Sequence, residues 1–482
     1  MAPSSHIDKR SAWENLPLEV FEQTLTYMDA TSLITLARVN RLFNYMALEQ
    51  FFGKPMMNDL LRASKFFNIP ASTRVGGEVS TIEALRLALW LQQLEHIHHR
   101  LSREHFSSDI KSLMLIIARI PTLKTLHLDL KEVYYPEDYM PELAMAKLCD
   151  IAVAKGCESL RLGCLVEVYQ RLQHRQKARL FHVVDSSFKK ANLRVIQICG
   201  AFLIPPLSTY TSSLLEAHSA TIRHLHFDTS TTFIAAETWE KILGSVYFPN
   251  LETFLFNHPI MTRVKPPSLI SFLSSHPTLT TLRLNCGLYH SKDPFRDLEQ
   301  PTLPSLLVIE AESRLIAWLF RSRTACLNVK EVIIQQGEAN ARFLDEALSA
   351  VGGPQREGPP DKVVLKIRLF SRSWSAWMTR HIEDDDGDAR DGGLRNVWMI
   401  NLGFHVDFVV ASMDEEIMRC FAQWVALFPA LRYLEIVRPS VDPTVALDVA
   451  SVDKALHDII FKYCPKLESF LFISCDEDNY AV

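Results

Sequence analysis

The chain has 482 residues, of which 48% are hydrophobic and 22% charged, and its formal net charge at pH 7 is -5. This composition is typical of a soluble globular protein, and the length allows more than one domain. A slightly acidic chain has no global positive field, so we expect neither nucleic acid nor an anionic membrane surface as its main partner.

The start of the chain and its cysteines indicate a cellular compartment. Residues 1–10 are polar, and no stretch approaches the roughly 18 apolar residues that a membrane span needs. The nine cysteines are scattered and form no C-x-x-C pair, which is typical of reduced thiols. We therefore expect a cytoplasmic or nuclear protein that does not enter a membrane.

Three short helices are predicted over residues 11–52. Pro17 suits a first helical position, where no N–H is needed, and Asp29 can cap the second helix. Apolar residues recur at three- and four-residue steps along the first two helices: Val20, Phe21, Leu25, Met28, Leu33, Leu36 and Val39. About forty residues bury too little surface to be robust alone, so this unit needs a partner or the rest of the chain.

These helices resemble the F-box. The matching features are the Leu16-Pro17 start, the Met28-Asp29 corner, the Leu-rich second helix, Val39 and the run Arg41-Leu42-Phe43; a Trp common in the family is replaced by Phe51-Phe52. The resemblance implies binding to a Skp-type adaptor, and through it to a cullin. It also implies which residues face or support the adaptor: Leu16, Pro17, Val20, Leu33 and Val39. The alternative is an ordinary helical cap at the N-terminus.

A helical linker is predicted over residues 53–112. Residues 53–70 have a helical bias, and Gly76-Gly77 indicates a turn. Ser80 to Glu83 forms a capping box, which predicts a helix that continues to about Leu101. We expect this helix to join the N-terminal helices rigidly to the part of the chain that follows.

One apolar phrase recurs after residue 112: an apolar residue, two others, an apolar residue, one other and an apolar residue. Leu123-Leu126-Leu128 is a clear copy, and the copies start at 123, about 160, 193, 222, 251, 279, 306, 329, 364, 394, 431 and 467. Those at 160, 364 and 394 are weak. A period of this length is typical of a solenoid, in which each unit must stack on its neighbours to bury its apolar face.

The phrase resembles the leucine-rich repeat. Residues 464–475 match the cysteine-containing form C-P-x-L-x-x-L-x-L-x-x-C, with Phe replacing two Leu. The resemblance implies an α/β fold for residues 113–475, an irregular horseshoe of short parallel strands with outer helices, and a C-terminal tail over 476–482. A conventional α/β domain with parallel strands is the alternative. The whole chain resembles fungal-type F-box proteins with C-terminal leucine-rich repeats.

Motifs of catalytic and metal sites are missing from the sequence. In the acidic run from Glu383 to Asp388, a calcium-loop alignment places Ile382 where a carboxylate is required. His96, His98 and His99 fall on the predicted helix, where only the first and last share a face, and zinc needs more ligands. No phosphate loop, dinucleotide fingerprint, nucleophile elbow or zinc-protease motif occurs. We expect no enzymatic activity, no cofactor and no metal.

The predicted repeats place one residue of each strand on the concave face, between the last two apolar positions. Arg283, Arg368 and Trp398 are of the types enriched among binding hot spots, and we expect them to contact a target protein. A solvated sheet face without a ligand is the alternative.

The two resemblances together imply the substrate-recognition subunit of a Skp-cullin-F-box ubiquitin ligase, which binds the adaptor through the F-box and a target through the repeats. The alternative is a Skp-bound scaffold that transfers no ubiquitin. A stand-alone hydrolase on an α/β domain would need a catalytic triad and an oxyanion site in one pocket. The identity of the target cannot be read from the sequence.

Overall fold

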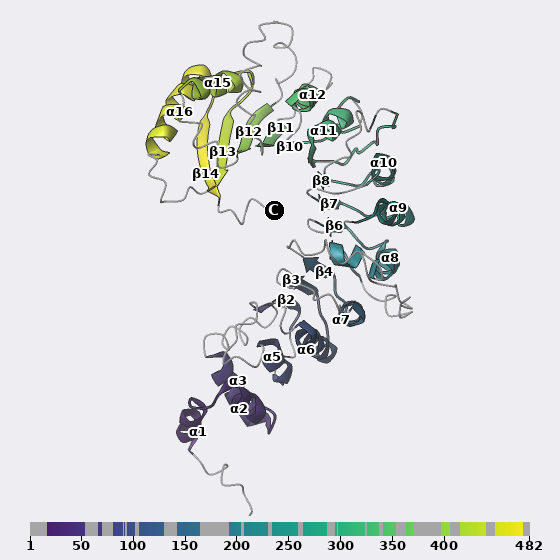
Figure 1. Cartoon of the computed structure of the whole chain (residues 1–482), viewed down its shortest axis with the longest axis vertical. Helices are drawn as coiled ribbons and strands as arrows, with labels where there is room; N and C mark the ends of the chain where they lie inside the picture. Colours follow the sequence, from purple (N-terminus) through teal and green to yellow (C-terminus); the bar gives the residue numbers. More distant parts are fainter. Residues whose placement is uncertain are drawn as a thin grey trace, which may run out of the picture. The chain divides into compact units, whose positions relative to one another are not determined.

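The structure described is a computed structural model of the chain. The described residues are 17–53, 66–69, 81–89, 91, 94–101, 106–129, 142–163, 192–203, 207–229, 234–258, 264–286, 295, 297–322, 325–336, 341–352, 363–369, 397–404, 415–439 and 449–475. The chain divides into two compact units, residues 1–197 with 205–218, and residues 198–204 with 219–482. Figure 1 shows the helices and strands of each.

The first unit begins with the three predicted helices, which the structure confirms: α1 (Leu18–Leu25), α2 (Ala30–Leu36) and α3 (Arg41–Phe52). Pro17 is the N-cap of α1 rather than its first residue. Asp29 caps α2 as predicted, because its Oδ1 accepts the Ser32 N–H at 2.7 Å. The core of this module consists of apolar side chains from all three helices: Phe21, Leu25, Leu33, Ile34, Ala47, Leu48 and Phe51.

Five parallel strands follow one another in sequence order in the first unit: β1 (Phe66–Ile69), β2 (His96–Arg100), β3 (Thr125–Asp129), β4 (Ser159–Gly163) and β5 (Val195–Cys199). Its further helices are α5 (Thr81–Leu87), α6 (Phe106–Arg119), α7 (Glu142–Ala154) and α8 (Leu207–His218). A short 3-10 helix, η4 (Gly200–Leu203), follows β5. Parallel strands with a helix in most connections are the arrangement expected of leucine-rich repeats.

The predicted helical linker over residues 53–112 is wrong, because β1 and β2 lie within it. The predicted helix ends at Leu87, and residues 96–100 form β2, paired with β3 so that Ile97 lies opposite Leu126 and His99 opposite Leu128. Leu94, Ile97 and His99 therefore form a copy of the repeat phrase. His99 occupies its last inward position and is fully buried, with its Nε2 3.6 Å from Asp109 Oδ2.

The second unit contains nine parallel strands in sequence order: β6 (His224–Asp228), β7 (Thr253–His258), β8 (Thr281–Cys286), β9 (Val308–Glu312), β10 (Glu331–Gln336), β11 (Val363–Leu369), β12 (Val397–Phe404), β13 (Tyr433–Pro439) and β14 (Ser469–Cys475). Its helices are α9 (Ala236–Ser245), α10 (Pro266–Ser274), α11 (Ser313–Leu319), α12 (Ala341–Gly352), α15 (Glu415–Val425) and α16 (Val449–Tyr463). The helices α9 and α10 lie side by side next to β7 and β8 (Figure 1).

Aromatic side chains fill the interior between these helices and strands. The Trp239 ring of α9 meets Phe227 of β6 edge to face at a centroid distance of 5.4 Å and Phe256 of β7 at 4.6 Å. Phe254 and Phe272 continue this cluster toward α10 at 4.7 Å. Each pair joins residues of different segments, so the repeats stabilise one another as the solenoid prediction requires.

The structure corrects the register of the three weak repeat copies. Strand pairing aligns Leu160 with Leu126, so the copy near 160 begins at Cys157, which is fully buried where other copies have an aliphatic residue. The inward residues of β11 and β12 are Val363, Leu365 and Ile367, and Val397, Ile400 and Leu402. The register shifts between Val363 and Val364, where β12 has one more residue than β11.

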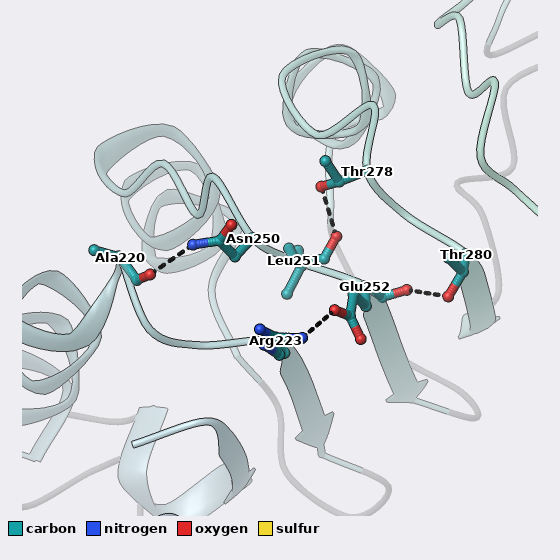
Figure 2. A network of polar contacts seen from close by, with 7 residues as sticks. All are labelled: Ala220, Arg223, Asn250, Leu251, Glu252, Thr278 and Thr280. Carbon is teal, nitrogen blue, oxygen red and sulfur yellow. Dashed lines mark hydrogen bonds and ion pairs between the residues drawn. The ribbon is translucent and has the colours of Figure 1, made fainter. Parts of the chain in front are cut away.

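A recurring bond joins neighbouring repeats where their strands begin. The backbone carbonyl of Arg223 accepts the N–H groups of Glu252 and Thr253 at 2.8 and 3.0 Å. The Glu252 carbonyl accepts those of Thr280 and Thr281 at the same distances. Figure 2 shows side chains that reinforce this start: Arg223 pairs with Glu252 at 2.8 Å, and Thr280 Oγ1 donates to the Glu252 carbonyl at 2.9 Å.

Side-chain amides and hydroxyls extend the same pattern. Asn250 Nδ2 donates to the Ala220 carbonyl at 2.8 Å, and Thr278 Oγ1 donates to the Leu251 carbonyl at 2.8 Å (Figure 2). The carbonyls that accept these bonds lie just before the strands, where the backbone takes no part in β-sheet pairing. The side chains therefore provide the hydrogen-bond partners that the sheet does not. We call the two-donor carbonyls and these side-chain bonds the strand-start network.

A buried histidine holds the segment before β7. His276 Nδ1 lies 2.6 Å from the Phe272 carbonyl, and its Nε2 accepts the Phe248 N–H at 3.0 Å. Accepting that N–H requires a neutral imidazole with the proton on Nδ1. Burial lowers the pKa of His276 below its usual value, which also favours the neutral form.

The corrected register predicts a large loss of stability for a substitution at Leu160 and a small one at the adjacent Arg161. Leu160→Asp places an unpaired charge at a fully buried position and should lower the free energy of unfolding by about 3–5 kcal/mol. Arg161→Asp changes an exposed side chain on the other face of β4 and should cost no more than about 0.5 kcal/mol. Urea unfolding of both variants measures this, and equal losses would contradict the register.

His276 predicts a pH-dependent contribution to stability. Because its folded-state pKa lies below the unfolded value, the contribution is present above about pH 6.5 and is lost as the pH falls. His276→Gln should lower the free energy of unfolding by about 1–3 kcal/mol at about pH 8 and by less at about pH 5.5. Urea unfolding at both pH values tests it; a deficit that does not change with pH would rule out this role of the imidazole.

Candidate protein-docking surfaces

Exposed apolar side chains concentrate on the N-terminal module. Among the described residues, half of the twelve exposed large apolar side chains fall between residues 18 and 45: Leu18, Val20, Tyr27, Val39, Leu42 and Tyr45. The exposed fractions of Val20 and Val39 are 45% and 63%. Such a concentration on a small three-helix unit marks a surface that another protein covers.

The predicted adaptor residues take different places in this module. Pro17, Val20 and Val39 are exposed, as a contact surface requires. Leu33 is 5% exposed and lies in the module core, so it supports the helices and does not face a partner. Leu16 lies outside the described residues.

Sequence reasoning missed Leu42 and Tyr45, which lie one turn apart on α3 and are both exposed. The neighbouring Phe43 stacks on Phe21 of α1 at a centroid distance of 4.8 Å. Met46 and Ala47 supply the buried face of this helix, so the exposure of Leu42 and Tyr45 follows from packing, which the sequence does not show.

The buried side chain of Asn44 fastens the module to the helix that follows it. Its Nδ2 donates to the carbonyls of Ala37 and Leu87 at 2.8 and 2.9 Å, and its Oδ1 accepts the Leu89 N–H at 3.3 Å. Asn44 is 3% exposed, so these bonds replace water on every polar atom they join. One amide thus ties α2, α3 and the end of α5 together.

Arg119 continues this connection into the repeats. From the last turn of α6, its guanidinium donates to the carbonyls of Arg86 and Ala88 at 2.8 and 2.9 Å, at the C-terminal end of α5. A cation at this end of a helix satisfies free carbonyls and complements the helix dipole. The end of the short helix α5 is therefore bonded on one side to Asn44 of α3 and on the other to Arg119 of α6.

Arg283 lies on the sheet face that was predicted to be concave, and it already has a partner. Its Nε is 3.4 Å from Glu310 Oε2, and Gln335 Nε2 donates to Glu310 Oε1 at 2.5 Å. The Arg283 side chain is 41% exposed, whereas Glu310 is 4% exposed. Arg283 therefore neutralises the buried Glu310 carboxylate, while part of its own side chain remains accessible to solvent. Ile333, in the same row, is 2% exposed, so this part of the face is not accessible.

Arg368 and Trp398 do not share the row of Arg283, which corrects the predicted placement. Strand pairing extends that row through Lys366 and Asn401, so Arg368 lies two residues farther along β11. Trp398 is the extra residue of β12 at the register shift, and its carbonyl accepts the Arg432 N–H at 2.8 Å. Four strand steps at about 4.8 Å separate β8 from β12, so the two strands are roughly 19 Å apart along the sheet. Trp398 is offset from the Arg283 row by three further residues along β12.

The first unit has a polar row at the equivalent position of its strands. Pairing aligns His98, His127, Arg161 and Gln197 on β2 to β5. The rings of His98 and His127 stack at a centroid distance of 4.1 Å and an interplanar angle of 4°. Burial, followed by the charges of His98 and Arg161, lowers the pKa of His127 to about 4.

Two kinds of reactive site, a metal site and a thiolate nucleophile, set requirements for the described histidines and cysteines. No three His, Cys, Asp or Glu side chains come together to hold a metal ion within the described ranges. Burial raises the pKa of the Cys157 thiol to about 12 and that of Cys464 to about 11, which disfavours the nucleophilic thiolate. No helix in the described part of the chain combines the length and apolarity of a membrane crossing.

Comparison with known proteins identifies the N-terminal module. Residues 13–53 match the F-box domain family. The solved leucine-rich repeat-containing protein LegL7 from Legionella pneumophila is similar over 82% of this chain and 98% of its own, with 12% sequence identity and a TM-score of 0.38. No curated protein sequence matches the chain. Residues 13–53 are therefore an F-box domain, and the parallel strands that follow carry the apolar phrase predicted for leucine-rich repeats.

The junction predicts that Asn44→Ala loosens the F-box from α5. The change leaves the carbonyls of Ala37 and Leu87 without their buried donor, which should cost about 1–3 kcal/mol. Hydrogen exchange should accelerate in α1 to α3 and leave β6 to β8 unchanged. Thr35→Ala, at an exposed position of α2, is the matched control. Unchanged exchange in Asn44→Ala would mean that the amide does not carry the junction.

Proposed function

We propose that the chain is the substrate-recognition subunit of a Skp-cullin-F-box ubiquitin ligase. The observation that carries this proposal is the F-box match at residues 13–53 together with the exposed apolar side chains of α1 to α3. F-box domains bind Skp-type adaptors, and leucine-rich repeats are protein-interaction folds. The adaptor would link the chain to a cullin, while the repeats would hold the target.

The adaptor contact has a simple energetic basis. Val20, Val39 and Leu42 are about half exposed in the free chain, so each would contribute about 1–2 kcal/mol if an adaptor covered it fully. The loss of translational and rotational freedom on association offsets part of this gain. The net binding free energy therefore comes mainly from the few side chains that the adaptor covers fully. Leu33 contributes indirectly because it holds the helices that present them.

The chain would act by positioning and not by bond-making. Asn44 and Arg119 fix α1 to α3 against α5 and α6, so a target held by the first-unit repeats stays in a defined place relative to the adaptor. This raises the effective concentration of target lysines near the enzyme that transfers ubiquitin. No residue of this chain has to be catalytic.

A Skp-bound scaffold without ubiquitin transfer is the second candidate function, since it uses the same adaptor surface. Affinity purification with and without proteasome inhibition, read by mass spectrometry, separates the two. A ligase subunit should co-purify a cullin, and at least one other partner should accumulate when the proteasome is inhibited. Recovery of the adaptor without a cullin would favour the scaffold.

The adaptor surface makes a direct prediction. Val20→Glu combined with Val39→Glu should reduce co-purification of the Skp adaptor at least about a hundredfold, because two apolar contacts are replaced by charges. Both side chains are exposed, so the melting temperature should not change. Leu115→Glu, at an equally exposed apolar residue of α6, should bind like the wild type. Full adaptor recovery by the double variant would refute this surface.

A further inference from the structure

The row His98, His127 and Arg161 has an uneven balance of charge. On β2, Arg100 Nε lies 3.0 Å from Asp129 Oδ2 of β3, so this arginine and the nearest carboxylate neutralise each other. His96 is bonded to the Thr125 hydroxyl at 3.0 Å, and His99 points to the other side of the sheet, toward Asp109. These contacts leave Arg161 as the exposed charge of the row.

The charges at the strand starts do not change this balance. Lys124 of the β3 start pairs with Glu95 at 2.5 Å, and Glu158 and Arg194 precede β4 and β5 with opposite charges. Arg161 is exposed and has no ion pair with any described residue. Gln197, the next member of the row on β5, is uncharged. The row thus presents a cation beside two stacked imidazoles and an amide, and it contains no carboxylate.

We propose that this row binds an acidic, extended segment of the target protein. The inference rests on the proposed target-binding function and names the chemistry of the ligand. Three neighbouring row members span about 10 Å across the strands, and alternate residues of an extended chain are about 6.6 Å apart. Two carboxylates at alternate positions, about 6.6 Å apart, therefore fit within the row. Nucleic acid fits less well, because duplex or single strands need several phosphate-neutralising cations and the row offers one.

Proton uptake should accompany binding. Both imidazoles have a lowered pKa, with burial as the first cause, so the free chain holds them neutral near pH 7. A carboxylate placed against them favours the protonated form and raises the pKa. The charge of Asp129 acts in the same direction on both imidazoles. Arg100 and His99 oppose protonation of His98, and His98 and Arg161 oppose that of His127. Affinity for the acidic segment should rise as the pH falls from about 8 to about 5.5.

Fluorescence anisotropy of the full-length chain tests the proposal with two labelled ten-residue peptides, one alternating Glu and Ser and one alternating Gln and Ser. The Glu peptide should bind more tightly than the Gln peptide, and Arg161→Gln should weaken it about tenfold through loss of one charge-assisted contact. Arg223→Gln, at a similarly exposed arginine outside the row, is the control and should not weaken binding. His98→Gln with His127→Gln should remove the pH dependence.

Three results would overturn the proposal: equal affinity for the two peptides, wild-type affinity in Arg161→Gln, or stronger competition by a single-stranded oligothymidylate of equal charge. Adaptor recovery, measured on the same protein, reports separately on the proposed ligase role. If the Val20→Glu, Val39→Glu double variant loses the adaptor and still binds the Glu peptide, the row functions independently of the F-box surface and the proposal is supported. Arg161→Gln should retain the adaptor.

Discussion

The two-donor carbonyl that recurs at most of the described strand starts is the interaction on which the rest of the structure depends. In the first unit the carbonyls of Lys124 and Glu158 each accept two N–H groups of the next repeat, and in the second unit Arg223, Glu252 and Thr280 do the same. A shift of one residue would break both bonds and turn every apolar side chain away from the core. The bond therefore fixes the register, and with it the rows of side chains that cross the sheet.

That constraint decides which surfaces are open to a partner. With the register fixed, Arg283 and Gln335 both contact the buried carboxylate of Glu310. These polar groups bond to one another, so fewer of them are available to a partner protein. The row at His98 and Arg161 keeps its polar groups accessible. Asn44 bonds the F-box helices to α5, and the F-box helices and the polar row belong to the same compact unit.

The sequence predicts most of the fold because three aliphatic or aromatic residues at fixed spacing report a buried strand. The prediction fails where another residue type fills a core position. His99 takes the third position of the copy at residues 94–99, so this copy was missed. Cys157 takes the first position of the copy near residue 160, so that copy was placed in the wrong register. Trp398 was misplaced because an apolar run fits two registers, and only the pairing across β11 to β13 decides between them. The exposed side chains of α3 also required packing information, since spacing alone does not show which apolar face is buried.

A cryo-electron microscopy structure of the chain bound to its Skp adaptor would test the central claim most directly. The account predicts that the adaptor covers Val20, Val39 and Leu42, that Leu33 stays inside the three-helix core, and that the bonds of Asn44 to α5 persist. The row at Arg161 should remain open to solvent in that complex. An adaptor that contacts the repeats and leaves the apolar face of α1 to α3 exposed would contradict the account.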